Sequence, residues 1–408
     1  MTTFCCRACG AGRGRLILDL GNQPLANGLL TQADLNAPEP RFPLRLAACE
    51  SCWLLQIIDL VPPADLFSDY LYFSSFSDAL LRHSAAAVER HIRDFQLGPQ
   101  SRVIEIASND GYLLKNFVAA GIPCLGIEPA ANIAKVATER GIPTLCRFFG
   151  EELAKELTAS NQQADLILAN NVFAHVPDIN GFVAGIATLL RPGGRAVIEF
   201  PYGCDMVEHV EFDTIYHEHV FYFTLTALVP LMARHGMEVF NVERLAIHGG
   251  SLRLSIARTG THTVLPAVAA LAAEERSKGV GSAGYYDDFG RRVQGIRQDL
   301  IALLDRLQSE GKSIAAYGAS AKGSTLLNFY GLDSRRISFV VDRSTAKQGR
   351  FTPGTHIPIV PPEELVRRRP DYAVLLTWNF AEEILAQQQA YRDAGGHFIV
   401  PVPTVRVV

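Results

Sequence analysis

Short apolar runs alternate with longer amphipathic stretches from about residue 101 to the end of the chain. The run that starts at Val103 has the pattern of a buried strand, and the polar tetrapeptide Ser108–Gly111 ends it. An amphipathic helix is expected from about Tyr112, and residues 123–128 are expected to form a second strand that ends in Glu128. This order of strand, loop, helix and strand predicts a nucleotide-binding α/β unit.

The same alternation predicts a parallel sheet with helices on both faces. Residues 189–200 are expected to contain a helix end, a Gly-Gly turn and a strand, and residues 262–310 are mostly helical in pattern, with a loop at 279–284. A second strand–loop–helix unit follows at 313–325, so the fold class is α/β with two Rossmann-like units. Other strands are expected at 164–171, 337–342, 372–376 and 397–401.

Paired cysteines mark the N-terminal part of the chain. Cys6-x-x-Cys9 and Cys49-x-x-Cys52 can bring four thiolates onto one tetrahedral ion, the pattern of a structural zinc site, although Cys5 is an alternative to Cys6. The competing interpretation is scattered buried cysteines. The remaining three cysteines are expected to be inert core residues: Cys124, Cys146 and Cys204.

A chain of 408 residues is long enough for two or three domains. We expect a zinc module at 1–65, a cofactor domain at 66–260 and a second α/β domain at 261–408. Residues 66–80 are rich in aromatic and hydroxyl side chains, which suits either a sugar or nucleotide site or a packed connector, and a helix is expected from about Ser77 to Asp94.

Charge and hydropathy restrict the class of partner. A net charge of −4 gives no electrostatic case for nucleic acid, and no apolar run reaches the roughly 18 residues that a membrane span needs. The N-terminus lacks the pattern of a signal peptide. We therefore expect a cytoplasmic protein that acts on a small molecule.

The first strand–loop–helix unit carries the candidate cofactor site. Its loop lacks the G-x-G-x-x-G pattern of dinucleotide sites, so S-adenosylmethionine is the first candidate. Glu128 is expected to bind the ribose hydroxyls. Ligands of such folds lie at the carboxyl ends of the strands. The predicted cofactor-binding residues are Glu105, Ala107, Asn109, Gly111, Glu128, Pro129, Asn170 and Asn171.

Four proton-active side chains are adjacent at Tyr216-His-Glu-His219. A histidine titrates near neutrality, a carboxylate can orient it, and a tyrosine can donate to an oxyanion, so the cluster favours general acid–base chemistry. A metal site and an internal hydrogen-bonded cluster are the alternatives. His248-Gly-Gly follows, a turn that can bring backbone close to a ligand.

The second unit has a loop of small residues from Gly318 to Gly323. Exposed amides at a helix start and the charge of Lys322 suit a phosphate or diphosphate, although the Walker A spacing is missing. A tight turn without a ligand is the alternative.

Together these motifs resemble the three-domain sugar C-methyltransferases that act on nucleotide-linked 4-keto-deoxyhexoses. The resemblance covers nearly the whole chain and implies methyl transfer to the carbon next to the ketone, usually C-3. It also implies that the substrate, a dTDP- or GDP-linked sugar, is bound between the last two domains. By resemblance, His219 is the base, Glu218 and Tyr216 are orienting or oxyanion partners, and His175 and Tyr72 are further active-site residues, with Tyr70 a rival for Tyr72. The expected substrate-binding residues are Tyr70, His248, Ser320 and Lys322.

Two other functions compete with this interpretation. An O- or N-methyltransferase for small molecules would share the cofactor site without needing an enolising base. A non-catalytic scaffold would use the zinc module and the α/β units only to hold partners.

Overall fold

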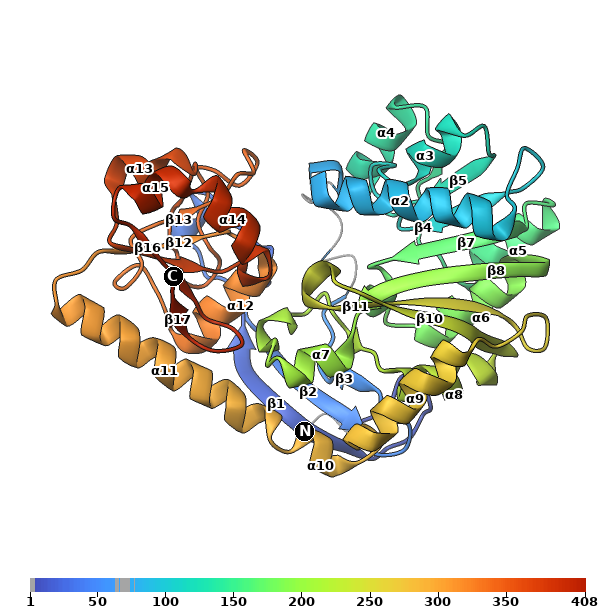
Figure 1. Cartoon of the computed structure of the whole chain (residues 1–408), viewed down its shortest axis with the longest axis horizontal. Coiled ribbons are helices and arrows are strands. Elements are labelled where there is room, and N and C mark those ends of the chain that lie inside the picture. The colour runs from blue at the N-terminus through green and yellow to red at the C-terminus, as the bar shows by residue number, and fades with distance from the viewer. Residues whose placement is uncertain (1–3, 63–65, 67–73, 77) are drawn as a thin grey trace.

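The computed structural model describes residues 4–62, 66, 74–76 and 78–408. The described residues form three sheets, which Figure 1 shows as a central unit, a C-terminal unit and an N-terminal sheet below and between them. Among these residues, no helix is both long and apolar enough to cross a bilayer.

The N-terminal sheet has the order β1-β2-β3-β9 and is antiparallel. Its last strand comes from far along the chain, since Leu55 pairs with Tyr222 and Gln56 with Phe221. The cysteine module is therefore continuous with the segment that follows the Tyr216–His219 cluster. The elements are β1 (Gly14–Gln23), η1 (Asp34–Asn36), β2 (Phe42–Cys49), β3 (Leu55–Ile57) and β9 (Phe221–Tyr222).

The central sheet has the order β10-β11-β8-β7-β4-β5-β6, with β4 to β8 parallel and β10 and β11 antiparallel. Alternate residues of β4 face opposite layers: Val103 packs in a cluster with α2 and α3, and Ile104 in the cluster that contains α5 and α6. The strands are β4 (Val103–Ile106), β5 (Cys124–Ile127), β6 (Thr144–Leu145), β7 (Ala164–Asn170), β8 (Leu190–Pro201), β10 (Met237–Leu245) and β11 (Ser251–Arg258). The helices are η2 (Ser74–Phe76), α2 (Asp78–Phe95), α3 (Leu114–Ala119), α4 (Ala131–Glu139), α5 (Glu151–Ala159), η3 (Phe173–His175), α6 (Ile179–Leu189), α7 (Gly203–Glu208), η4 (Phe212–Thr214), α8 (Leu225–Arg234) and η5 (Ile247–Gly249).

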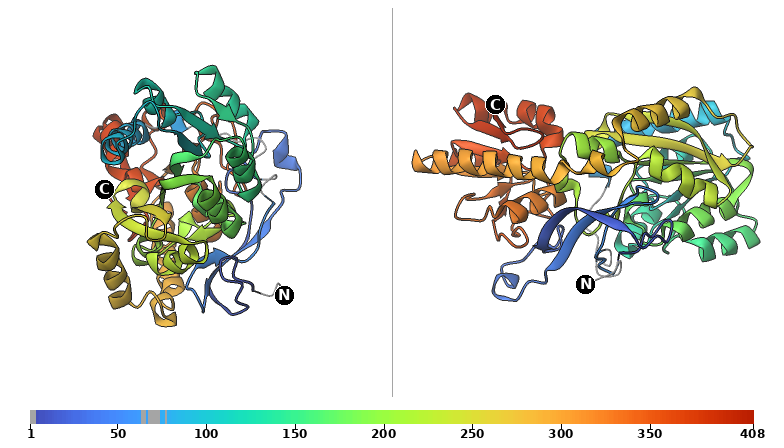
Figure 2. Two further views of the ribbon diagram at one scale, coloured as in Figure 1. Left: turned by 90° about the vertical axis from the view of Figure 1, so that its right-hand side faces the viewer. Right: turned by 90° about the horizontal axis from the view of Figure 1, so that it is seen from below.

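The C-terminal sheet has the order β14-β13-β12-β15-β16-β17, parallel except for β17. The amphipathic helix α11 connects the two α/β units and runs alongside the N-terminal sheet (Figures 1 and 2). The elements are α9 (Pro266–Lys278), α10 (Ala283–Tyr286), α11 (Phe289–Ser309), β12 (Ile314–Tyr317), α12 (Ala321–Tyr330), β13 (Val340–Val341), β14 (Ile359–Val360), α13 (Glu363–Arg368), β15 (Tyr372–Leu375), η6 (Trp378–Phe380), α14 (Ala381–Gln387), α15 (Gln389–Asp393), β16 (His397–Val400) and β17 (Arg406–Val407).

Three local expectations were wrong. The helix after β4 starts at Leu114, two residues later than the expected start at about Tyr112, because a turn occupies the preceding residues. No turn separates α6 from β8: Gly193 and Gly194 lie within the strand, where a Cβ on Gly194 would come within 2.9 Å of the Ala164 carbonyl oxygen. Cys146 is exposed and not part of the core.

Candidate active site

His219 is held from both sides of its ring. Its Nδ1 lies 3.0 Å from the carbonyl oxygen of Thr214, and its Nε2 lies 2.7 Å from the hydroxyl of Tyr216. Because a carbonyl can only accept, Nδ1 carries the hydrogen and Nε2 of the neutral ring accepts from Tyr216. The nitrogen that faces Tyr216 is therefore the one with a lone pair.

His175 lies edge-on to this ring. It ends η3, just beyond the carboxyl end of β7, and the two imidazole centroids are 4.8 Å apart at 77°. Burial lowers the pKa of His175 to about 4, although a hydrogen bond with the Glu218 backbone opposes the shift. His175 is thus neutral at pH 7 and places no positive charge beside His219.

The other two members of the cluster point to the N-terminal module. The amide Nδ2 of Asn27 donates to Oε1 of Glu218 at 2.6 Å, and Nε2 of His217 lies 3.2 Å from the carbonyl oxygen of Pro43. Burial raises the pKa of Glu218 to about 7. The structure thus brings together His175, Tyr216 and His219, with Glu218 reaching the module through Asn27.

A small cavity of about 10 Å³, the size of one water molecule, adjoins His219. Glu211 lines it together with Thr214 and Tyr222. Burial, followed by the nearby carboxylates Asp213 and Asp205, raises the pKa of Glu211 to about 8, and the charge of Lys322 opposes that shift. Sequence reasoning missed Glu211, which stands alone in the sequence without a motif.

The predicted cofactor residues meet at the carboxyl ends of β4, β5 and β7. Glu128 accepts from the backbone N–H of Asn109 at 3.0 Å and of Ala130 at 2.9 Å, so its remaining lone pairs are available to a ligand. Asn109 has a φ of 49°, and Gly111 has a φ of 77° at a point where a Cβ would come within 2.7 Å of Ile142. Only glycine fits this close approach without movement.

The floor of the crevice contains buried polar groups. Glu105 is 1% exposed, and burial, followed by the charge of Glu128, raises its pKa well above the ordinary range. Oδ1 of Asn170 is buried without a partner among the described residues. An amide oxygen that lacks a partner is the feature that a ligand donor would satisfy. Asn171, with a φ of 54°, Ala107, with a φ of 55°, and Pro129 complete the predicted set.

A buried ion cluster beside this crevice was not predicted. Glu199, near the end of β8, lies 2.8 Å from Nε2 of His83 and 2.6 Å from Nε of Arg253. The backbone N–H of Asn171 donates to the Glu199 carbonyl at 2.8 Å. The cluster ties α2 and β11 to the loop after β7, and no sequence spacing links these three segments.

Side-chain hydrogen bonds hold the backbone of the predicted phosphate loop. Ser320 caps α12 by accepting from the N–H of Gly323, and the N–H of Ala319 donates to Asp342 at 2.8 Å. Nζ of Lys322 lies 4.8 Å from the centre of the Trp378 ring and is buried without a partner among the described residues. The ammonium group of Lys322 therefore forms no direct ion pair with a described residue.

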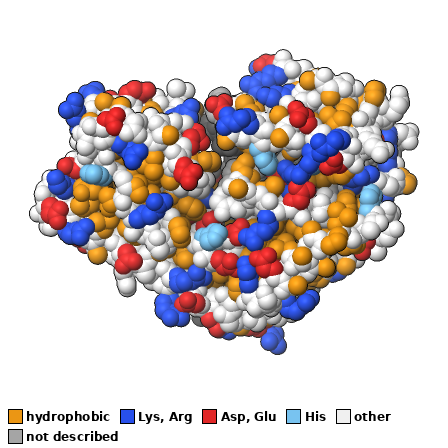
Figure 3. Space-filling view, viewed as in Figure 1, with side chains coloured by type: hydrophobic (Ala, Val, Ile, Leu, Met, Phe, Trp, Pro, Cys, Tyr) orange, Lys and Arg blue, Asp and Glu red, His pale blue; other side chains and the backbone are white. Residues whose placement is uncertain are grey.

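A larger cavity of about 480 Å³ opens beside this loop. Tyr317, Gly318, Asp342 and Arg343 line it from the C-terminal unit, and Asp78 lines it from α2 of the central unit. In Figure 3 the surface is hollowed between these two units. Tyr70 and Tyr72 lie outside the described residues, and of His248 only the backbone, in η5, is described.

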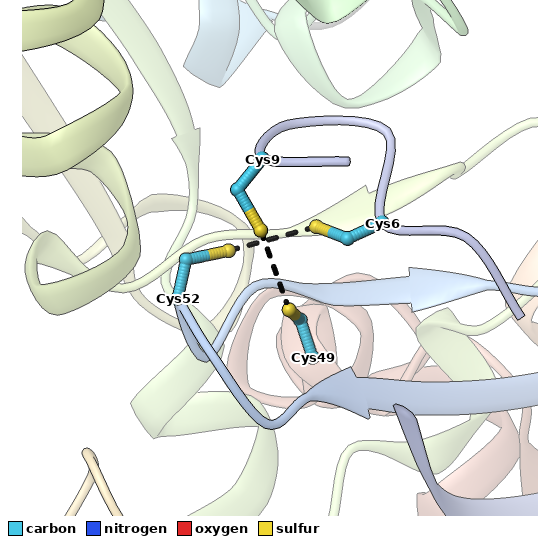
Figure 4. Close-up of side chains that lie close together, drawn as sticks. All are labelled: Cys6, Cys9, Cys49 and Cys52. Atoms are coloured by element: carbon cyan, nitrogen blue, oxygen red, sulfur yellow. Dashed lines mark hydrogen bonds between the residues drawn. The ribbon is translucent and has the colours of Figure 1, made fainter. Parts of the chain in front are cut away.

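The four predicted thiol ligands converge (Figure 4). All four sulfurs lie within 4.8 Å of one another, with 3.6 Å between Cys6 and Cys52 and between Cys9 and Cys49. A tetrahedral ion with zinc–sulfur bonds of about 2.3 Å requires sulfurs about 3.8 Å apart, so the set fits zinc. Cys5 is exposed, which leaves Cys6 as the ligand.

The metal-binding loop is attached to the central unit. Nδ2 of Asn180 donates to the carbonyl of Arg7 at 2.7 Å, and Nη2 of Arg234 donates to the carbonyl of Ala8 at 2.9 Å. Zinc would therefore fix the turn between β2 and β3, and β3 is the strand that pairs with β9.

Family models match three consecutive parts of the chain: a zinc binding domain at residues 6–67, a methyltransferase domain at 76–242 and a C-methyltransferase C-terminal domain at 246–403. C-methyltransferase NovU of Streptomyces niveus is 37% identical over 404 residues, which cover 99% of this chain and 96% of NovU. The chain belongs to the C-methyltransferase family. The resemblance in the motifs is thereby confirmed, and this C-methyltransferase is an enzyme and not a scaffold.

Other similarities are partial. Ubiquinone biosynthesis O-methyltransferase of Bradyrhizobium sp. (strain ORS 278) is 28% identical over 116 residues, or 27% of the C-methyltransferase and 44% of that protein. A structure of magnesium protoporphyrin IX methyltransferase from Synechocystis PCC 6803 covers 48% of the C-methyltransferase and 89% of that chain, with 12% identity and a TM-score of 0.35.

Proposed function

We propose that this C-methyltransferase transfers a methyl group from S-adenosylmethionine to C-3 of a nucleotide-linked 4-keto-6-deoxyhexose. The observation that carries the proposal is the fixed tautomer of His219, whose Nε2 is the basic nitrogen and faces Tyr216. Carbon is a poor nucleophile until a proton next to a carbonyl is removed. A positioned neutral histidine is suited to that step at pH 7.

The proton transfer assigns a role to each neighbour. The hydroxyl hydrogen of Tyr216 first turns from Nε2 of His219 to the ketone oxygen, which frees the Nε2 lone pair. Nε2 then takes the proton from the carbon, and the electron pair of the broken C–H bond moves toward the ketone oxygen, which gives an enolate whose charge the Tyr216 hydroxyl stabilises. Once Nε2 carries the proton it can donate to the Tyr216 oxygen, which lies 2.7 Å away.

The cofactor crevice fits S-adenosylmethionine. Glu128 keeps free lone pairs for ribose hydroxyls, and the Oδ1 atom of Asn170 is a buried acceptor that needs a donor. When bound there, S-adenosylmethionine supplies an electrophilic methyl group on a sulfonium. The chain's part in that transfer is to hold the enolate carbon in line with it.

The nucleotide part of the substrate is proposed to occupy the 480 Å³ cavity between the C-terminal unit and α2. Gly318, the first residue of the Gly318–Gly323 loop, lines this cavity, and the charge of Lys322 in the same loop, which has no partner among the described residues, suits a diphosphate. We also propose that the three functional units are residues 1–65, 66–260 and 261–408.

The test is incubation with labelled S-adenosylmethionine and a panel of thymidine- and guanosine-linked 4-keto-6-deoxysugars. We expect one nucleotide sugar to gain one methyl mass, with the label bonded to carbon in its ¹³C NMR spectrum. A label on oxygen or nitrogen would contradict the proposal, as would transfer to none of the panel.

A further inference from the structure

The segment that contains the Tyr216–His219 cluster contacts the N-terminal module along one side. His217 lies against Pro43, the N–H of Ile57 donates to the Val220 carbonyl at 3.0 Å, and β9 is the fourth strand of the module's sheet. Most of these contacts are made by the backbone. The contact to Glu218 is different, because one side chain of the module reaches a catalytic side chain.

That side chain is Asn27. It lies in the loop after β1 and is itself exposed, while the Glu218 carboxyl that it meets at 2.6 Å belongs to a residue only 5% exposed. The loop is anchored to the C-terminal unit as well, since Leu30 and Phe351 exchange backbone hydrogen bonds at 3.0 and 2.8 Å. Asn27 therefore stands where all three units meet.

The direction of this hydrogen bond matters for the site. An amide N–H can only donate, so it favours the ionised carboxylate and fixes which oxygen, Oε1, faces the module. A buried carboxyl that lost its donor would be less readily ionised and free to change rotamer.

We propose that Asn27 is a positioning residue of the methyl-transfer reaction, which holds the Glu218 carboxyl in place from the metal-binding module. The inference rests on the proposed function, because it assumes that Glu218 acts in the chemistry. It explains why the module extends a loop past its own sheet to the active site. The metal-binding module thus contributes a side chain to the site in addition to its support of β9.

The comparison uses Asn27→Ala, Asn27→Asp and the control Asn22→Ala, an exposed asparagine at the end of β1. Asn27→Ala should lower kcat about 10- to 100-fold, the effect of losing a hydrogen bond to a charged group, with zinc content and the KM for S-adenosylmethionine unchanged. Asn22→Ala should behave as wild type. A kcat for Asn27→Ala within twofold of wild type would overturn the inference.

Asn27→Asp separates positioning from packing. The variant keeps the shape of the side chain but sets a second carboxyl against Glu218, so we expect activity to recover as the pH is lowered and the pair shares one proton. The titratable neighbours of Glu218 include Tyr216, His217 and His219 on its own segment and His175 on η3, which hydrogen-bonds with the Glu218 backbone. Activity equal to that of wild type at every pH would count against the inference.

A measurement that does not depend on turnover tests the role of Asn27 separately from the proposed function. The pKa of the Glu218 carboxyl, followed by ¹³C NMR of glutamate-labelled protein, should rise in Asn27→Ala and stay unchanged in Asn22→Ala. If wild type methylates no keto sugar but this shift occurs, the proposed function fails and the Asn27 contact stands. If wild type is active and the pKa of Glu218 does not move, the inference about Asn27 fails alone.

Discussion

The hydroxyl of Tyr216 lies 2.7 Å from Nε2 of His219. Nε2 carries no hydrogen, because Nδ1 donates the ring hydrogen to the Thr214 carbonyl. This relationship links a candidate base to a candidate oxyanion donor before any substrate is present. The geometry needs no change of tautomer for the first proton transfer.

Replacement of His219 by asparagine should remove that transfer. We expect kcat to fall by about two to four orders of magnitude, the usual contribution of a general base, while the dissociation constant for S-adenosylmethionine stays within twofold. Tyr216→Phe should give a smaller loss, because the base remains and only the oxyanion donor is removed. Steady-state kinetics and calorimetric titration measure both effects, and unchanged turnover in His219→Asn would exclude it as the base.

Loss of zinc should lower activity even though the cysteines do not contact the candidate active site. The cysteine loops lie at one end of the sheet that contains β9, and β9 follows His219 directly. Chelation, or Cys52→Ser, should therefore lower both the thermal midpoint and kcat, with zinc content measured by metal analysis. Cys5→Ser is the matched control and should retain zinc and activity, since Cys5 is exposed. Full activity in metal-free protein would contradict this role.

Stability should fall with rising pH because of Glu211. Its pKa is raised from the ordinary 4.5 to about 8 in the folded protein, so the folded state holds a proton that the unfolded state has lost. That stabilisation is complete below about 4.5 and is lost as the pH rises through about 8, at a rate of up to about 1.4 kcal/mol per unit. The free energy of unfolding, measured with denaturant at several pH values between 6 and 8.5, should fall less steeply with pH for Glu211→Gln than for wild type. Equal slopes would mean that another group is responsible.

Lys322 provides a test of the nucleotide site. Lys322→Ala should raise the KM for the nucleotide sugar about tenfold or more, because a diphosphate would lose a direct cation, and should leave the KM for S-adenosylmethionine unchanged. Lys312→Ala, which changes a lysine paired with Asp371 at the surface of the same unit, is the control. A similar rise in both KM values would instead indicate that Lys322 supports the junction with Asp213 and Trp378.

Local patterns were enough to predict several parts of the molecule. The strand at Val103, the acid at Glu128 and the four-cysteine site depend on short spacings, and the structure brings each of them to the expected place. Hydrophobic alternation also predicted the two α/β units, because each strand and helix carries its own pattern. The exposed Cys146 is an exception, because the segment after β6 lies at the surface, where the nearby Phe148 is also exposed.

Contacts between distant segments could not be predicted in this way. Nothing in the sequence near Leu55 indicates that it pairs with Tyr222, and nothing near Asn27 indicates that its amide reaches Glu218. The burial that raises the pKa of Glu211 likewise comes from the packing of separate units. Such features depend on tertiary structure, for which a single sequence contains no periodic signal.

The most direct test of the central claim is exchange of the proton that His219 is proposed to remove. The accepted nucleotide sugar is incubated in D₂O with the enzyme and S-adenosylhomocysteine, so that no methyl transfer can follow, and ¹H NMR reports the signal at C-3. We predict loss of that signal with wild type and its retention with His219→Asn. Equal exchange in both, or none with wild type, would contradict the account.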